Sequence, residues 1–225
     1  MADKTQTFNR DCLEAMREFP DKFFELAIVD PPYGLGEGQN KVNTRSISTA
    51  KWKNAVAPQY GGGVWDNEPM SLEYFIELQR ITKHQIIWGA NHFIENIPNA
   101  NSSSWAVWYK VGQNDKVDFA ACELAWTSHK KAVDFFRFDW TGFGAVNAKE
   151  ERIHPTQKPV ALYKWLLKNY AKEGDKILDS HCGSQSSRIA AFDMGFAYWG
   201  YELDKDYFEA GNKRFNQHKA QLKLF

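Results

Sequence analysis

The sequence predicts an α/β fold in which a mostly parallel sheet is covered by helices on both faces. Strand-like and helix-like segments alternate along the chain, and most of the strands are continuous apolar runs, as at residues 24–29. Such runs are typical of strands that are buried on both faces. A chain of 225 residues with 43% hydrophobic side chains is long enough for one domain with a sizeable core.

The first part of the chain predicts strand, helix and strand. We expect a short strand at residues 5–8, a helix at about 11–18 with Asp11 as its N-cap, and a strand at 24–29. Residues 34–69 are rich in glycine and proline and keep no regular period, which predicts a long loop. Loops of that length are usually functional.

The rest of the chain continues the alternation. Ser71 precedes a segment with apolar positions at helical spacing, which is typical of a capped helix. We expect further helices at residues 72–81, 160–167, 186–194 and 204–222, and further strands at residues 85–88, 105–109, 122–126, 133–138, 176–179 and 197–201.

The net charge of the chain is zero, with a pI of about 7.0. Proteins that bind nucleic acid are often strongly basic, so the total charge gives no support to such a partner. The distribution is more informative, because residues 38–65 contain no Asp or Glu. Four positive charges lie in that stretch, on Lys41, Arg45, Lys51 and Lys53.

Cysteine content and hydropathy place the chain among cytoplasmic proteins. The three cysteines, Cys12, Cys122 and Cys182, form no C-x-x-C pair, which argues against a disulfide framework or a zinc site and fits a reducing compartment. The chain has no run of 18 apolar residues, so we expect no membrane span.

The segment Asp30-Pro31-Pro32-Tyr33 directly follows the strand predicted at residues 24–29. The Asp30 carboxylate and the Pro31 carbonyl can both accept hydrogen bonds from one exocyclic amine. The Tyr33 ring can stack on the base that carries the amine. A plain turn is the alternative interpretation, because proline ends strand ladders and favours turns.

A second segment, residues 177–187, predicts a strand, a turn of small residues and the start of a helix. Gly183 would let the backbone approach a ligand, and the hydroxyl of Ser184 and the helix N-terminal amides offer donors. Glu202 ends the next strand about 20 residues after Asp179, where an acid binds ribose hydroxyls in nucleoside-binding α/β folds. Many strand–helix–strand units share this spacing, so a purely structural turn stays open.

These two segments resemble motifs of a known family. Residues 30–33 are similar to the signature (Asp/Asn/Ser)-Pro-Pro-(Tyr/Phe/Trp) of the amino-methylating DNA methyltransferases. Residues 179–187 resemble that family's cofactor turn, commonly Asp-Pro-Phe-x-Gly-Ser-Gly-Thr-Thr, with Ser180, His181 and Gln185 as departures. With these departures the turn resembles that of a phage or prophage branch of the family, which uses Asp-(Ser/Thr)-His-x-Gly-Ser there.

Two further segments extend the resemblance over nearly the whole chain. Residues 154–159 are similar to the family's His-Pro-(Thr/Ala)-x-Lys-Pro segment, which borders the methionine part of S-adenosylmethionine. Residues 9–13 resemble the Gly-Asp-Cys segment that touches the cofactor adenine, with Arg10 in place of the glycine. The catalytic tetrapeptide precedes the cofactor turn, which is the circularly permuted order of the family's beta class.

The resemblance implies a Rossmann-like S-adenosylmethionine-dependent methyltransferase fold, with a mostly parallel seven-stranded sheet in a single domain over residues 1–225. It implies S-adenosylmethionine as cofactor, double-stranded DNA as partner, and no metal. The catalytic residues that it implies are Asp30, Pro31, Pro32 and Tyr33. The cofactor-binding residues that it implies are Asp11, Cys12, Asp30, Thr156, Lys158, Asp179, His181, Gly183, Ser184, Ser186 and Glu202.

The implied reaction is transfer of a methyl group to the N6 amine of an adenine that is flipped out of the duplex and stacked on Tyr33. The loop at 34–69 would close over DNA, with its lysines and arginine, Lys41, Arg45, Lys51 and Lys53, at phosphates. Residues 110–150 are a candidate target-recognition insertion. Gln185 removes a permissive backbone position from the cofactor turn, which bears on cofactor affinity.

The length of the chain leaves little room for a large recognition domain, and no nuclease motif is present. We therefore expect a solitary or prophage-encoded enzyme of a bacterium or phage, in the cytoplasm at the nucleoid, with a homodimer as its candidate assembly.

Three other functions remain open from the sequence. The nearest is N4-cytosine methylation, for which the family often has Ser-Pro-Pro-Tyr, so Asp30 favours adenine. Methylation of RNA or of a protein amide is another, although the amide methylases usually carry Asn-Pro-Pro-Tyr. The third is a catalytically inactive module that binds nucleic acid, supported by Gln185 and the zero net charge.

Overall fold

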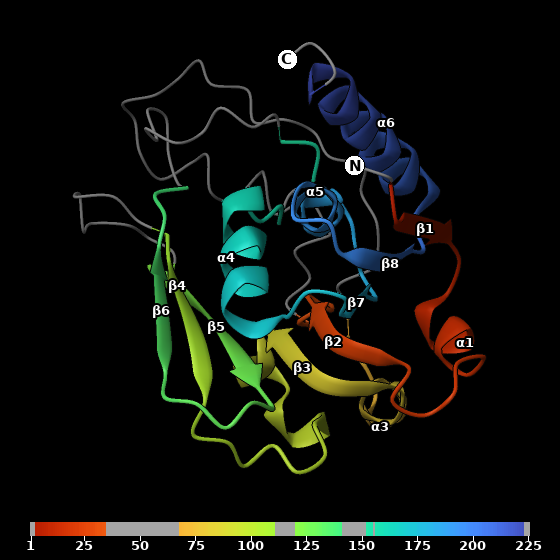
Figure 1. Cartoon of the computed structure of the whole chain (residues 1–225). Helices are drawn as coiled ribbons and strands as arrows, with labels where there is room; N and C mark the ends of the chain where they lie inside the picture. The colour runs from red at the N-terminus through yellow and green to blue at the C-terminus, as the bar shows by residue number, and fades with distance from the viewer. Residues whose placement is uncertain (1–2, 35–67, 111–119, 141–151, 155, 223–225) are drawn as a thin grey trace, which may run out of the picture.

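A computed structural model describes residues 3–34, 68–110, 120–140, 152–154 and 156–222. These residues form one eight-stranded sheet with the strand order β1-β8-β7-β2-β3-β5-β4-β6 (Figure 1). The strands are β1 (Thr5–Asn9), β2 (Phe24–Val29), β3 (Thr82–Trp88), β4 (Trp105–Tyr109), β5 (Cys122–Thr127), β6 (Asp134–Arg137), β7 (Lys176–Asp179) and β8 (Ala197–Glu202).

The sheet is mostly parallel, as predicted, and it has eight strands where the family resemblance implied seven. Five neighbouring pairs are parallel, and only β5 runs against its neighbours β3 and β4. The extra strand follows from pairing at both edges, because short β6 pairs with β4 and β1 pairs with β8. The strand segments expected from the sequence already include both edge strands, so only the number implied by the family resemblance was too low.

Helices cover both faces of the sheet, as predicted (Figure 1). One face packs against α4 (Val160–Tyr170) and α5 (Ser186–Asp193). The opposite face packs against α1 (Cys12–Met16) and α3 (Leu72–Ile81). The side chains of β2 alternate between these two cores, with Leu26 and Ile28 on one side and Ala27 and Val29 on the other, so that residues 26–29 are all apolar.

The predicted caps are confirmed, and some boundaries moved. The side chains of Asp11 and Ser71 accept hydrogen bonds from the backbone N–H groups of Glu14 and Tyr74, which satisfies donors at the starts of α1 and α3. Helix α1 ends earlier than expected, at Met16. Strand β3 begins earlier than expected because Thr82, directly after α3, is already extended.

The last helix, α6 (Lys205–Leu222), lies near α5 and β1. Two short 3₁₀ turns, η1 (Ala90–His92) and η2 (Ile94–Asn96), follow β3. Among the described residues, no helix is long and apolar enough to span a membrane. The three cysteines are free, with Cys12 and Cys182 buried and Cys122 exposed.

Candidate functional site

The predicted site residues gather at one edge of the sheet, where its parallel strands end. Asp30 follows β2, Asp179 ends β7, Glu202 ends β8, and Asp11 lies just beyond the end of β1. These four strands are neighbours in the sheet, in the order β1-β8-β7-β2 (Figure 1). The carboxyl edge of a parallel sheet is where α/β proteins bind ligands.

The tetrapeptide after β2 forms a bonded unit. The Tyr33 hydroxyl donates to Asp30 Oδ1 at 2.6 Å, and Lys158 Nζ donates to Asp30 Oδ2 at 2.5 Å. Each carboxylate oxygen has a second lone pair, so Asp30 keeps the capacity to accept from another donor. Pro31 is buried, which fixes the backbone between the carboxylate and the ring.

The Tyr33 ring is held by contacts with residues that directly follow β3. It stacks on His92, with ring centroids 5.3 Å apart and planes at 17°. Gly89, at φ +68°, makes room for it, because a Cβ there would lie 2.1 Å from the Tyr33 ring. This glycine therefore permits the close approach of the ring to the end of β3.

A row of four alternating charges extends from Asp30 towards β5. Lys158 Nζ lies 2.5 Å from Asp30 and 3.2 Å from Glu123 Oε2, and Lys110 Nζ lies 2.6 Å from Glu123 Oε1. Lys158 is the most buried member, with a side chain that is 4% exposed. We call these four residues, Asp30, Lys158, Glu123 and Lys110, the charge row.

The charge row sets the protonation of its members. Burial raises the pKa of Asp30, and the Lys158 ammonium opposes this rise while the Glu123 carboxylate adds to it. Burial also acts against the ionised Glu123, but Lys158 and Lys110 outweigh it and lower the pKa of Glu123. Burial disfavours the charged form of Lys158, yet Asp30 and Glu123 raise its pKa. Lys158 and Glu123 are therefore an ion pair at neutral pH.

The sequence indicated Lys158 but missed Glu123 and Lys110. Lys158 was expected beside the cofactor, whereas its ammonium bonds to the catalytic motif. Glu123 had a signal that could have been used, since it is the only charged residue in the otherwise uncharged strand β5.

The second predicted segment forms a tight turn around Asp179. The Asp179 carboxylate accepts from Ser187 Oγ at 2.6 Å and from the backbone N–H of His181 at 3.0 Å. Burial raises the pKa of Asp179 to about 7. Ser184 and Ser186 are buried, with their hydroxyls 3.2 Å apart. Asp179 therefore holds the turn in shape.

His181 lies inside the site. Its Nδ1 is 2.9 Å from Ser180 Oγ, and its Nε2 is 3.9 Å from Cys12 Sγ. Burial lowers the pKa of His181 to about 4, so the ring is neutral at neutral pH. Burial also raises the pKa of Cys12 to about 12, which keeps its thiol protonated. The contact between His181 and Cys12 joins the turn after β7 to the start of α1.

Glu202 and its neighbours offer groups that suit a nucleoside. Glu202 Oε2 accepts from the backbone N–H of Gly183, and Oε1 accepts from that of Asp204, both at 2.9 Å. Each oxygen keeps one lone pair for a ribose hydroxyl. The next residue, Leu203, is 69% exposed, an apolar surface on which a base can lie. Asn9, which pairs with Glu202 across β1 and β8, brings Asp11 to the same place.

The departure at Gln185 is accommodated by a contact outside the turn. Gln185 has a left-handed backbone, at φ +59°, and its side chain is fully buried. Its amide accepts from Arg188 at 2.9 Å and points at α6, where a Cβ on Gly211 would lie 2.7 Å from Gln185 Cγ. The Gln185 side chain is thus directed towards α6. The absence of a side chain at Gly211 gives it the space that a glycine in the turn would not need.

The segment before α4 lies against the cofactor turn. The His154 ring is in van der Waals distance of a Cβ built on Gly183, and it packs on Tyr207 of α6. Burial lowers the pKa of His154 to about 4. Thr156 is exposed, two residues before buried Lys158. The structure therefore brings this segment beside both predicted motifs.

Some predictions cannot be placed. The predicted DNA contacts Lys41, Arg45, Lys51 and Lys53 lie outside the described residues, as do parts of the 110–150 segment. The described part of that segment supplies β5 and β6 of the main sheet.

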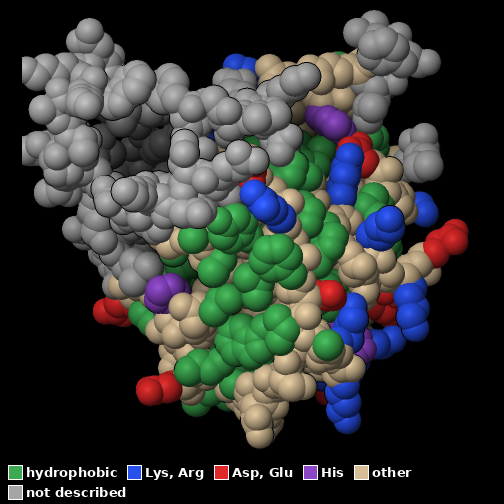
Figure 2. All heavy atoms as spheres, turned by 90° about the vertical axis from the view of Figure 1, so that its left-hand side faces the viewer, with side chains coloured by type: hydrophobic (Ala, Val, Ile, Leu, Met, Phe, Trp, Pro, Cys, Tyr) green, Lys and Arg blue, Asp and Glu red, His purple; other side chains and the backbone are tan. Residues whose placement is uncertain are grey.

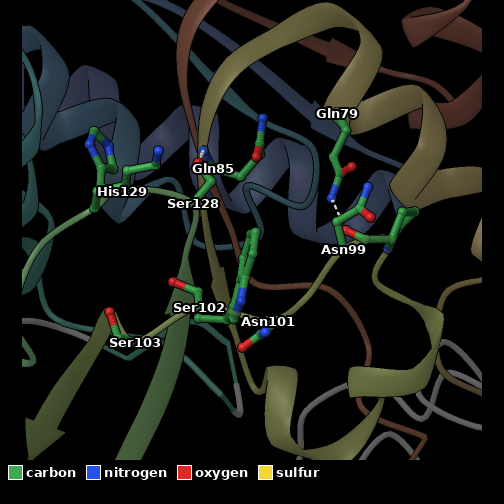
Figure 3. Close-up of a pocket in the computed structure, with 11 residues that line it drawn as sticks. Gln79, Gln85, Asn99, Asn101, Ser102, Ser103, Ser128 and His129 are labelled. Atoms are coloured by element: carbon green, nitrogen blue, oxygen red, sulfur yellow. Dashed lines mark hydrogen bonds between the residues drawn. The ribbon is translucent and has the colours of Figure 1, made fainter.

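A cavity of about 300 Å³ lies between α3, β3 and the segments before β4 and after β5 (Figure 3). Gln79 of α3, Gln85 of β3, and Ser128 and His129 after β5 contribute to its wall, and Gln79 donates to the carbonyl of Pro98. None of the predicted site residues lines it. Its lining is mostly polar side chains, and it does not include the catalytic tetrapeptide.

Comparison with known proteins identifies relatives over nearly the whole chain. A family model described as DNA methylase, of the N6/N4 methyltransferase type, matches residues 101–213. The type II methyltransferase M2.MboI of Moraxella bovis is 23% identical, over 96% of this chain and 89% of its own length.

Solved structures show the same fold. A putative DNA modification methylase of Thermus thermophilus, TTHA0409, in complex with S-adenosyl-L-methionine, is similar with a TM-score of 0.59 and 15% identity, covering 95% of this chain and 94% of that one. The cytosine-N4-specific PvuII DNA methyltransferase is similar with a TM-score of 0.61 and 14% identity, covering 96% and 87%.

Proposed function

Since this chain belongs to the N6/N4 DNA methylase family, we propose that it transfers a methyl group to the N6 amine of adenine in double-stranded DNA. The chain is a DNA methyltransferase, and S-adenosylmethionine is its methyl donor. The observation that carries the choice of adenine is a carboxylate, Asp30, at the first position of the tetrapeptide.

The residues at the carboxyl edge of the sheet fit this donor. Glu202 has lone pairs for the ribose hydroxyls, and exposed Leu203 beside it offers an apolar surface to the adenine. The backbone at Gly183 lies beside Glu202, and Gly183 has no side chain that would block a ligand there. When bound, S-adenosylmethionine supplies an electrophilic methyl group on a sulfonium centre, so the reaction needs no metal.

The chain's own residues activate the amine by positioning it. The lone pair of an exocyclic adenine amine is conjugated into the ring, which makes the nitrogen a poor nucleophile. The Asp30 carboxylate and the Pro31 carbonyl accept its two N–H bonds, which favours a pyramidal nitrogen with its lone pair directed outward. The N–C bond forms as the carbon–sulfur bond breaks, and the nitrogen then releases a proton to Asp30.

The target base must leave the duplex to reach this edge. Tyr33, held against His92 and Gly89, presents a ring on which the flipped base stacks. The loop at 34–69 would close over the DNA and contact phosphates through its four basic residues. Residues 110–150 would contribute to sequence recognition within the same domain of residues 1–225.

Methylation of cytosine N4 is the second candidate. The PvuII enzyme with the same fold is cytosine-N4-specific, so the fold alone does not select the base. Asp30 favours adenine, because the related cytosine enzymes often carry serine at that position.

The test is methyl transfer from labelled S-adenosylmethionine to unmethylated bacterial DNA, followed by mass analysis of the nucleosides. N6-methyladenine supports the proposal, and N4-methylcytosine overturns the choice of base. If no label enters DNA while S-adenosylmethionine still binds, the substrate proposal fails.

We also propose that the enzyme acts as a homodimer on DNA in the bacterial cytoplasm, at the nucleoid, as a solitary or prophage-encoded methyltransferase. Figure 2 shows hydrophobic side chains gathered on the face that carries β6 and α4. Val133, just before β6, and Phe135 of β6 are 58% and 60% exposed, and the next residue, Phe136, stacks on Trp165 of α4. An exposed apolar surface of this kind is typical of a protein–protein contact.

A further inference from the structure

We propose that Glu123 and Lys158 are positioning residues for methyl transfer, and that the charge row holds the Asp30 carboxylate oriented and free to accept from the target amine. This inference rests on the proposed function, because it concerns how the same site works. It assigns a role to Glu123, which belongs to neither of the two motifs at the site.

Lys158 holds Asp30 without any donor left for the substrate. An ammonium has three N–H bonds, and Lys158 Nζ has three acceptors, at 2.5 Å on Asp30, 3.2 Å on Glu123 and 3.3 Å on the Tyr33 hydroxyl. All three N–H bonds are directed to protein atoms. Lys158 therefore fixes the carboxylate and the ring relative to each other.

Glu123 prevents Lys158 from binding Asp30 alone. It accepts from Lys158 on one oxygen and from Lys110 on the other, so the row alternates in sign and sums to zero. Without its charge, two lysines would face one aspartate, with an uncompensated positive charge in a mostly buried site. That charge would oppose the positive charge that develops on the amine nitrogen as the methyl group arrives.

The substitution Glu123→Gln keeps the shape and removes the charge. We expect kcat to fall at least about tenfold, while the KM values for DNA and S-adenosylmethionine stay within about twofold, because the loss concerns the reacting step. Adding Lys110→Met restores a net charge of zero, so the double variant regains part of the lost kcat. The matched control is Glu209→Gln, which removes a carboxylate from an exposed ion pair on α6.

Two changes to the row predict opposite shifts in the titration of Asp30. Glu123→Gln removes a negative neighbour, so Asp30 loses its proton at lower pH. Lys158→Met removes the positive neighbour, so Asp30 loses its proton at higher pH. The titratable groups that interact with Asp30 are Lys158, Glu123 and Tyr33, together with Asp179, Tyr74 and Tyr163, which neither substitution changes. The acid limb of the kcat profile should follow these shifts, each by about one pH unit.

Carboxyl ¹³C NMR of the protein without DNA or cofactor, with the Asp30 signal assigned from Asp30→Asn, measures the same titration. Opposite shifts in NMR together with rescue of kcat by the double variant support the proposal. Equal loss in Glu123→Gln and in the double variant, or shifts of the same sign, overturns it. If the two variants show opposite NMR shifts but the native protein methylates no DNA, the charge row is correct and the proposed reaction is wrong.

Discussion

Asp30 is the residue on which the proposed chemistry depends most. Its carboxylate touches Tyr33 and Lys158 and keeps lone pairs for the amine. We predict that Asp30→Ala lowers kcat by about a thousandfold, since positioning and proton acceptance are both lost. Asp30→Asn keeps one carbonyl acceptor and should retain more activity than Asp30→Ala. Labelled-methyl transfer measures both, with DNA affinity as a control; equal activity of the two variants would contradict the role of the acceptor.

Asp179 makes stability depend on pH. Its pKa is about 7 in the folded chain and about 4 in an unfolded one, so the folded state binds the proton more tightly. The stabilisation is complete below about pH 4 and is lost as pH rises to about 7. We predict that Asp179→Asn, which stays neutral, gains stability relative to the native chain by a few kcal/mol over this range. Denaturant unfolding at pH 5 and pH 8 measures it, and an unchanged difference at the two pH values would refute the assignment.

At the level of elements, the contact of α5 with α6 explains how the cofactor turn tolerates Gln185. Gly211 gives the buried amide its space. Alanine in place of glycine within a helix normally stabilises, by about 0.5–1 kcal/mol. We predict instead that Gly211→Ala destabilises by about 1–3 kcal/mol, because its Cβ overlaps the Gln185 side chain. The free energy of unfolding measures this.

The double variant Gly211→Ala with Gln185→Gly is the matched test of that contact. It removes the overlap and the left-handed backbone of a non-glycine residue together. Its stability should therefore recover towards the native value. If the two changes destabilise additively, the two side chains are not in contact as described.

The sequence was most informative about elements formed by neighbouring residues. The strand at 24–29 and the helix at 72–81 were predicted with their observed ends, because an apolar run and a Ser71 cap are local signals. The charge row was not predictable in this way. Asp30 and Lys158 are 128 residues apart, and only the neighbouring positions of β2, β3 and β5 bring Glu123 to them.

For the whole molecule, the apolar surface of β6 and α4 predicts self-association. We expect the native protein to sediment at about twice 26.0 kDa at micromolar concentration. Phe135→Glu places a charge on the exposed position and should shift the protein towards the monomer. Sedimentation equilibrium distinguishes these states, with Leu72→Glu, at an exposed apolar position on α3, as the control. A native protein that stays monomeric would remove the proposed dimer.

The burial of Lys158 has a consequence for the response of the enzyme to ionic strength. Dissolved ions weaken attraction between exposed charges, but they screen buried pairs much less. Binding to phosphates depends on exposed charges, whereas the contacts of Lys158 with Asp30 and Glu123 are shielded from solvent. Added salt should therefore lower the amount of DNA that is bound while leaving the single-turnover rate of the bound complex nearly unchanged.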